Sequence, residues 1–311
     1  MDLDGRSGGV LRIAGAMRAV ILLLVALALA GCKDKAHESF SESPTRFRVV
    51  RESLYNQVMV ERDGDIVDLR FRRGKNVPRQ TAVDLSDPER LVIPYSRIML
   101  AAALVQPEPR RVLQLGLGGG AMNRYLRKVR PEVFLQTAEI DATVRDMAME
   151  FMGFRPDAQD VVVIEDARVF VRKNTETWDW ILVDAFSGGS VPPHLKTREF
   201  YVLLKARLAP GGVVAINLHR SNRLFASDQA TLRSVFSQVQ LFDVPGTGNV
   251  VALAFEGPAR NLRETDLSRF SGSFREHLGR AVAVYAGPAQ TEAAVLTDDY
   301  APTEFLQQQK E

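Results

Sequence analysis

Residues 112–121 read VLQLGLGGGA, an apolar segment that runs directly into a glycine-rich turn. Gly116, Gly118 and Gly120 carry no side chain, so a ligand can approach the backbone there, and a helix that starts after the turn points its free N–H groups at that ligand. The spacing Gly116-x-Gly118-x-x-Ala121 also fits the dinucleotide-binding fingerprint. Taken alone, the turn therefore leaves open a nucleoside, a dinucleotide, or a tight strand–helix turn without a ligand.

Short apolar strands alternate with helical segments on both sides of this turn. The expected strands are 112–115, 134–140, 161–164, 180–183 and 213–218, and the expected helices between them are 122–129, 143–152, 167–173 and 198–208. This order predicts parallel βαβ units in a doubly wound α/β sheet.

Two last strands, 238–244 and 250–255, follow a helix near 227–236. Because the short segment between them cannot hold a crossover helix, this pair must be antiparallel. A parallel sheet that ends in an antiparallel hairpin is typical of methyltransferase-like (Rossmann-type) folds and not of ordinary dinucleotide-binding folds.

A small β-domain precedes this sheet. Residues 47–71 form short alternating segments, and Asp63-Gly64 between two of them is a hairpin signal. A helix over 91–104 then leads into the larger part of the chain. We therefore expect an N-terminal β-domain with its linking helix over 47–104 and a methyltransferase-like nucleoside-binding domain over 105–311.

The first residues have the pattern of a secretory signal. Three arginines precede the apolar run 19–30, which is shorter than the roughly 20 residues that a membrane-spanning helix needs. The run ends in Leu29-Ala30-Gly31-Cys32, which has the form of a lipobox with Cys32 as the lipid acceptor; a short membrane anchor is the alternative. The sequence thus predicts a lipoprotein signal peptide over 1–32, a flexible tether over 33–46, and a lipid-anchored location in the cell envelope, outside the cytoplasm.

Composition excludes several kinds of partner. The net charge of +2 over 311 residues gives no basis for nucleic-acid binding. One cysteine cannot form an internal disulfide, and the four histidines lack metal-ligand spacing, so we expect no metal site.

Three acidic residues stand where consecutive strands end. Glu139 closes the second strand and can accept hydrogen bonds from both ribose hydroxyls. Asp166 follows the third strand, where it can meet an adenine amino group or cap the next helix. Asp184 ends the fourth strand and opens a long loop with the character of a lid. Because the carboxyl ends of parallel strands share one edge of the sheet, we expect the three carboxylates to meet beside the glycine turn.

Several short motifs resemble the spermidine synthase (polyamine aminopropyltransferase) family and the wider spermidine-synthase-like group. In chain order they are Ser53–Asn56, Gly116–Gly120, Ala138–Asp141, Glu165–Arg168, Val183–Phe186, Thr197–Tyr201 and Leu296–Pro302. Their order and spacing cover about four fifths of the chain. In that family an amine attacks the aminopropyl carbon beside the sulfonium of decarboxylated S-adenosylmethionine.

The resemblance implies a role for each acid. Glu139 would bind the ribose, Asp166 the adenine and Asp184 the attacking amine, while Asn56 and Tyr95 would contact substrate. It also implies a nucleoside co-substrate (decarboxylated S-adenosylmethionine or S-adenosylmethionine) with no tightly bound cofactor, and a homodimer formed through the β-domains.

The chain departs from the family pattern at three acidic positions. The glycine loop has Gly119, and the lid has Ser187, where the family has an aspartate. The family's Tyr-His-Glu segment reads Tyr95-Ser96-Arg97, and an Arg97 that points inward would repel a diamine or a sulfonium. In addition, the family's nucleoside is made inside the cell, which conflicts with the location that Cys32 predicts.

Three functional hypotheses follow. The first is a spermidine-synthase-like transferase that binds an adenosyl sulfonium nucleoside and transfers an alkyl group to an amine; methyl transfer from intact S-adenosylmethionine falls within this class. The second is a non-catalytic envelope lipoprotein that binds nucleosides or polyamines, which the missing acids favour. The third is a dinucleotide oxidoreductase, supported by the glycine spacing alone and opposed by the terminal antiparallel pair and Asp166.

Overall fold

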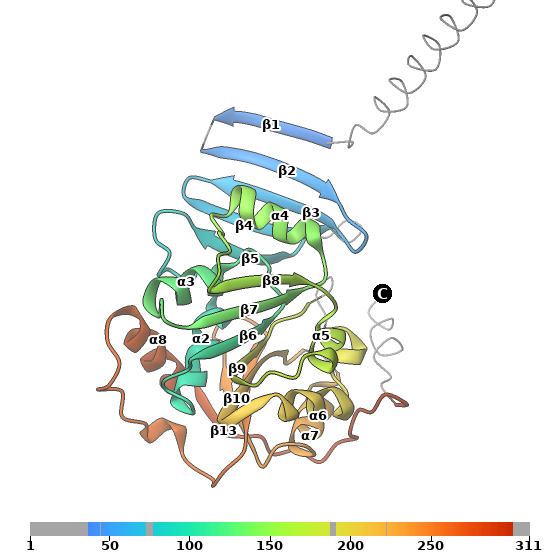
Figure 1. Ribbon diagram of the computed structural model, residues 1–311, viewed down its shortest axis with the longest axis vertical. Coiled ribbons are helices and arrows are strands. Elements are labelled where there is room, and N and C mark those ends of the chain that lie inside the picture. Colours follow the sequence, from blue (N-terminus) through green and yellow to red (C-terminus); the bar gives the residue numbers. More distant parts are fainter. Residues whose placement is uncertain (1–36, 44, 73–76, 187–190, 222, 301–311) are drawn as a thin grey trace, which may run out of the picture.

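The computed structural model of the 311-residue chain describes residues 37–43, 45–72, 77–186, 191–221 and 223–300 (Figure 1). The predicted signal peptide with its Cys32 lies outside these residues. Within the described part of the chain, no helix combines the length and the apolar character that crossing a membrane requires.

The N-terminal domain is a five-stranded antiparallel sheet whose strands are paired in sequence order. The strands are β1 (His37–Ser43), β2 (Arg46–Glu52), β3 (Gln57–Asp63), β4 (Ile66–Arg72) and β5 (Arg79–Asp84). The predicted hairpin joins β3 and β4, where Gly64 has a φ of 64° and Asp63 pairs with Ile66.

The expected tether over 33–46 needs a correction, because His37–Ser43 pairs with β2 as strand β1. This segment is polar and shows no apolar alternation. An edge strand is held by main-chain hydrogen bonds, which leave no mark in the hydrophobic pattern.

The second sheet has eight strands in the order β13-β11-β12-β10-β9-β6-β7-β8. The strands are β6 (Arg111–Leu115), β7 (Phe134–Glu139), β8 (Asp160–Ile164), β9 (Trp178–Val183), β10 (Leu208–His219), β11 (Gln238–Asp243), β12 (Asn249–Phe255) and β13 (Tyr285–Pro288). Strands β6 to β10 pair in parallel, and β12 is antiparallel to both β10 and β11. The predicted methyltransferase-like sheet with an antiparallel closure is therefore confirmed, and β13 adds a further antiparallel strand at the edge.

Helices cover both faces of this sheet (Figure 1). They are α2 (Pro94–Met99), α3 (Ala121–Val129), α4 (Ala142–Phe151), α5 (Ala167–Lys173), α6 (Arg198–Ala206), α7 (Phe225–Arg233) and α8 (Gly272–Ala283), with 3-10 segments η1 (Leu100–Leu104), η2 (Pro193–Leu195) and η3 (Leu262–Glu264). The α2, η1, α3 and α8 side chains share one apolar core with the sheet, and those of α5, α6 and α7 share another. The predicted linking helix is thus split into α2 and η1.

Helix α4 connects the two domains. Its Val144 and Met147 pack against Val60 and Leu69 of the N-terminal sheet in one buried cluster. The Ser53 hydroxyl also donates a hydrogen bond of 2.6 Å to Asp141, the residue that caps α4. These contacts place the N-terminal sheet next to the carboxyl ends of the parallel strands, where ligands bind in open α/β sheets.

Candidate active site

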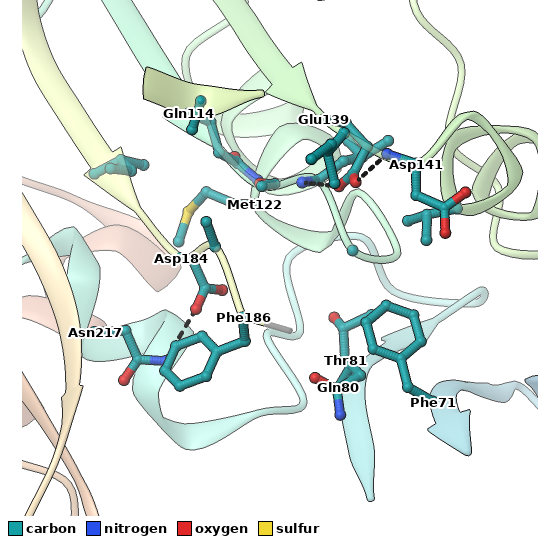
Figure 2. Close-up of a pocket in the computed structure, with 18 of the residues that line it drawn as sticks. Phe71, Gln80, Thr81, Gln114, Met122, Glu139, Asp141, Asp184, Phe186 and Asn217 are labelled. Carbon is teal, nitrogen blue, oxygen red and sulfur yellow. Dashed lines mark hydrogen bonds between the residues drawn. The ribbon is translucent and has the colours of Figure 1, made fainter. Parts of the chain in front are cut away.

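A cavity of about 430 Å³ opens between the N-terminal sheet and the carboxyl ends of the parallel strands. Of the residues predicted as site residues, its lining contains Asn56, Tyr95, Gly116, Gly118, Glu139, Asp166 and Asp184. Figure 2 shows Glu139 on the side of the glycine turn, Asp184 beside Asn217, and Phe71, Gln80 and Thr81 of the N-terminal domain across the opening. The three predicted carboxylates therefore share one cavity, and their roles in binding remain predictions.

The glycine turn is shaped by close contacts. Gly116 has a φ of 95°, and a Cβ there would lie 2.5 Å from the carbonyl oxygen of Asp184. The lack of a side chain at this position therefore lets the ends of β6 and β9 approach each other. Gly118, with a φ of 55°, also lines the cavity. Gly120 lies instead at the start of α3 against Phe154, so it shapes the turn and does not line the cavity.

Glu139 is buried at the end of β7 and holds the glycine turn in place. Its two carboxylate oxygens accept hydrogen bonds from the backbone N–H groups of Leu117 (2.8 Å) and Asp141 (2.9 Å). Burial raises the pKa of Glu139, and these hydrogen bonds oppose the rise. Each oxygen keeps a second lone pair, so the carboxylate can still accept hydrogen bonds from ribose hydroxyls.

Asp166 combines two tasks. One oxygen caps α5 by accepting hydrogen bonds from the N–H groups of Arg168 and Val169, both at 2.9 Å. The other lies 2.9 Å from Nε2 of His194, and this contact is the main reason that the pKa of Asp166 is lowered. An adenine amino group would thus meet an Asp166–His194 pair. Sequence reasoning missed His194, although Pro192-Pro193 directly before it marks a rigid segment.

The His194 segment is anchored at both ends. Lys196 forms a fully buried ion pair with Asp228 of α7 at 2.9 Å. Arg168 donates hydrogen bonds to the carbonyl oxygen of His194 and to Asp298 of the C-terminal segment. Residues 187–190 of the predicted lid, including Ser187, lie outside the described part of the chain.

Asp184 lies deep in the molecule with part of its surface on the cavity. It accepts hydrogen bonds from the Tyr95 hydroxyl and from Nδ2 of Asn217, each at 2.9 Å. Burial raises the pKa of Asp184 to about 6, and both hydrogen bonds limit the rise. The pKa of Tyr95 is raised well above its usual value of 10.0, first by burial and then by Asp184, so Tyr95 keeps its proton and acts as a donor.

Arg97 does not face the cavity. Its guanidinium donates hydrogen bonds to the carbonyl oxygens of Leu91 and Val92 (3.1 Å for Val92), on the other side of α2. The expected repulsion of a cationic substrate by an inward Arg97 is therefore absent. The reason is helical geometry: Tyr95 and Arg97 are two residues apart on α2, so they point to different sides.

Gly119 lies against two neighbouring side chains, which a side chain at this position would have to displace. A Cβ there would lie 2.5 Å from the Met152 methyl carbon and 2.8 Å from Cγ2 of Thr81. The space beside the missing aspartate is thus filled by a thioether and a threonine methyl group.

A glycine turn, an acid on the next strand and a cavity at the carboxyl edge of the parallel strands place the chain in the methyltransferase-like class of folds. Residues 93–245 match the spermine/spermidine synthase domain. The chain is 36% identical over 210 residues to a polyamine aminopropyltransferase of Vibrio vulnificus, which covers 66% of this chain and 70% of that one. A probable polyamine aminopropyl transferase of Bifidobacterium longum is 28% identical over 82% of this chain and 61% of its own length.

Solved structures agree on the fold. A probable spermidine synthase from Corynebacterium glutamicum aligns with a TM-score of 0.65 and 22% identity over 80% of this chain and 97% of that one. A spermidine synthase in complex with the transition-state analogue AdoDATO aligns with a TM-score of 0.56 and 20% identity, and the alignment covers 82% of this chain and 93% of that one. The chain belongs to the polyamine aminopropyltransferase family, a family of transferases.

The predicted location outside the cytoplasm is contradicted by these comparisons. The relatives are named polyamine aminopropyltransferases, a family of biosynthetic enzymes whose nucleoside substrate is made inside the cell. The prediction rested on a basic flank, a short apolar run and a four-residue motif around Cys32. So short a pattern carries less weight than a match over 210 residues.

Proposed function

We propose that this chain transfers an aminopropyl group from decarboxylated S-adenosylmethionine to an amine. The observation that carries the proposal is the placement of Glu139 and Asp184 on one cavity, on either side of the glycine turn, with the pKa of Asp184 raised to about 6. A carboxylate with that pKa is ionised at neutral pH and is more basic than an ordinary aspartate. Family membership supports the same reaction.

In this proposal some residues bind the nucleoside and Asp184 accepts the proton. Glu139 accepts hydrogen bonds from the ribose hydroxyls, and the Asp166–His194 pair meets the base. Asp184 accepts a hydrogen bond from the attacking amine and so orients its lone pair toward the aminopropyl carbon. As the C–N bond forms, the C–S bond breaks and its electrons remain on sulfur. The proton of the amine passes to Asp184 and then to solvent.

No general acid is required for the leaving group, because 5′-methylthioadenosine departs as a neutral thioether. The charge that needs stabilisation is positive and develops on the amine nitrogen. Asp184 is the carboxylate placed to stabilise it, and Tyr95 and Asn217 hold that carboxylate in position.

The test is a direct transfer assay. Purified protein is incubated with decarboxylated S-adenosylmethionine and a panel of amines, and 5′-methylthioadenosine release is followed by mass spectrometry. Asp184→Asn should lower kcat/KM by about 100-fold or more while nucleoside affinity stays within a few-fold. Methyl transfer from intact S-adenosylmethionine with no aminopropyl transfer would contradict the proposal, as would an unchanged rate in Asp184→Asn.

We further propose that two copies pair through the N-terminal sheet. Strand β1 is the terminal strand in the sheet order and pairs with β2 along one edge. An edge strand offers main-chain donors and acceptors to a second strand. Light scattering on the purified chain would test this, and a monomer at micromolar concentration would contradict it.

A further inference from the structure

Neutral amide side chains line the cavity on the side of Asp184 away from the glycine turn. Asn217 of β10 donates a hydrogen bond to Asp184, and Nδ2 of Asn249 at the start of β12 donates one of 2.9 Å to Oδ1 of Asn217. The three side chains form a ladder across β9, β10 and β12, which are neighbours in the sheet. Figure 2 shows the first rung, Asp184 with Asn217.

The carboxylates of the cavity lie on the other side of Asp184. Glu139 is the last residue of β7 and Asp166 follows β8, and both strands lie beyond β6 in the sheet order. Strands are about 4.8 Å apart, so Asn249 lies about 10 Å along the sheet from Asp184, in the direction opposite to Glu139. If the nucleoside occupies the glycine-turn side, Asn217 and Asn249 lie on the side of Asp184 that is left for the acceptor.

Among the described residues that line the cavity, no carboxylate lies at this end to attract a second ammonium group. His219 lines it, and its Nδ1 lies 2.8 Å from the Ser221 hydroxyl. Arg79 lines the cavity from β5, next to Gln80, and pairs with Asp68 at 2.7 Å. Among the described residues that line the cavity, the carboxylates are Glu139, Asp141, Asp166 and Asp184, and none of them lies on the β10–β12 side.

We propose that the acceptor is an amine with one basic nitrogen and a neutral hydrogen-bonding end, such as an amino alcohol, and not a diamine. The inference rests on the proposed function and names the substrate class of the same site. Amide groups both donate and accept hydrogen bonds, so Asn217 and Asn249 suit a hydroxyl or an amide. An ammonium group at that end would lose its hydration shell without gaining an opposite charge.

A matched pair of acceptors tests the proposal on the unmodified chain. With decarboxylated S-adenosylmethionine as donor, kcat/KM is measured for putrescine and for the amino alcohol of the same length, in which a hydroxyl replaces one amino group. The amino alcohol should be preferred by about 10-fold or more, the difference expected for one charged group left unpaired. Equal rates, or a preference for putrescine, would overturn the inference while leaving the proposed transfer intact. Failure of both amines, and of every other amine, would refute the transfer itself.

A gain-of-function variant gives a second test. Asn249→Asp places a carboxylate next to Oδ1 of Asn217, and a distal ammonium group can donate hydrogen bonds to both. It should raise kcat/KM for putrescine by about 10-fold and so move the ratio of the two kcat/KM values toward putrescine. Asn261→Asp is the matched control, because Asn261 is exposed, lies outside the cavity lining and caps η3 with an oxygen that aspartate retains. Unchanged putrescine kinetics in a folded Asn249→Asp protein that still binds 5′-methylthioadenosine would count against the inference.

Discussion

The hydroxyl of Tyr95 offers a direct way to test Asp184 as the base. It donates a hydrogen bond of 2.9 Å to Oδ2 of Asp184 from helix α2, 89 positions away in the chain. The substitution Tyr95→Phe keeps the ring and removes this donor alone. Asp184 then retains the hydrogen bond from Asn217, its other described partner.

The size of the effect follows from the loss of one hydrogen bond to a charged group. Such a bond contributes about 1.5–3 kcal/mol, and 1.36 kcal/mol corresponds to one pKa unit. Because the bond stabilises the ionised form, its loss raises the pKa of Asp184 from about 6 by roughly one to two units. In the proposed mechanism Asp184 acts in its deprotonated form, so activity should fall as the pH drops through this pKa. The acidic limb of the pH profile should therefore move to higher pH in the variant.

The assay is kcat/KM for aminopropyl transfer between pH 5 and about 9, since this parameter reports ionisations of the free enzyme. Tyr55→Phe is the control, because it removes a hydroxyl from the same cavity without removing a described partner of Asp184. An acidic limb that stays in place in Tyr95→Phe, or moves equally in Tyr55→Phe, would refute the assignment of Asp184 as the base.

Three further predictions concern binding and stability. Asp184→Asn should raise the free energy of unfolding by about 1–3 kcal/mol at pH 8 and by almost nothing at pH 4, because a carboxyl group whose pKa is raised in the folded state destabilises the fold only where the unfolded chain is ionised. Urea denaturation at the two pH values measures the effect, and an equal change at both would contradict it. Glu139→Gln should weaken the binding of 5′-methylthioadenosine by about 10-fold in calorimetry, because an amide has one oxygen that accepts hydrogen bonds and a carboxylate has two. Equal affinity of the two proteins would contradict the proposed contact of Glu139 with the ribose. Lys196→Met should lower the free energy of unfolding by about 3–5 kcal/mol, because it leaves Asp228 buried and unpaired. The double variant Lys196→Met with Asp228→Leu should recover most of that stability, and a double variant as unstable as the single one would count against this account.

The larger sheet could be predicted from the sequence because its signals are local. Apolar strands alternate with helices, and the short segment before Asn249 forces the final antiparallel pair. Helix α8 was also within reach, since Phe274, Leu278 and Ala281 recur at helical spacing and are buried, but the prediction stopped at residue 255. Strand β1 could not be predicted in this way, because its pairing depends on main-chain groups of β2 and not on its own side chains.

In the candidate site, too, the sequence predicts some residues and not others. Topology alone places Glu139, Asp166 and Asp184 at one edge, because parallel strands end together. The partners of these acids come from other parts of the chain: Tyr95 lies on α2, and His194 lies in the segment after the predicted lid. Asn217 did leave a signal, since it is a polar residue within the otherwise apolar run 213–218, but only the sheet order shows that it meets Asp184.

The effect of two departures from the family pattern, Arg97 and Gly119, can be judged only from the structure. In sequence, Arg97 looks like a cation in the binding site and Gly119 looks like a missing acid in an open space. In the fold, Arg97 is bound to carbonyl oxygens outside the cavity, and the space beside Gly119 is filled by Thr81 and Met152. Neither change adds a cation to the cavity lining, so neither argues against the proposed sulfonium nucleoside. The proposed preference for an acceptor with a single amino group rests on other residues: Asp184 is the carboxylate on the amine side, and the amides of Asn217 and Asn249 lie beyond it.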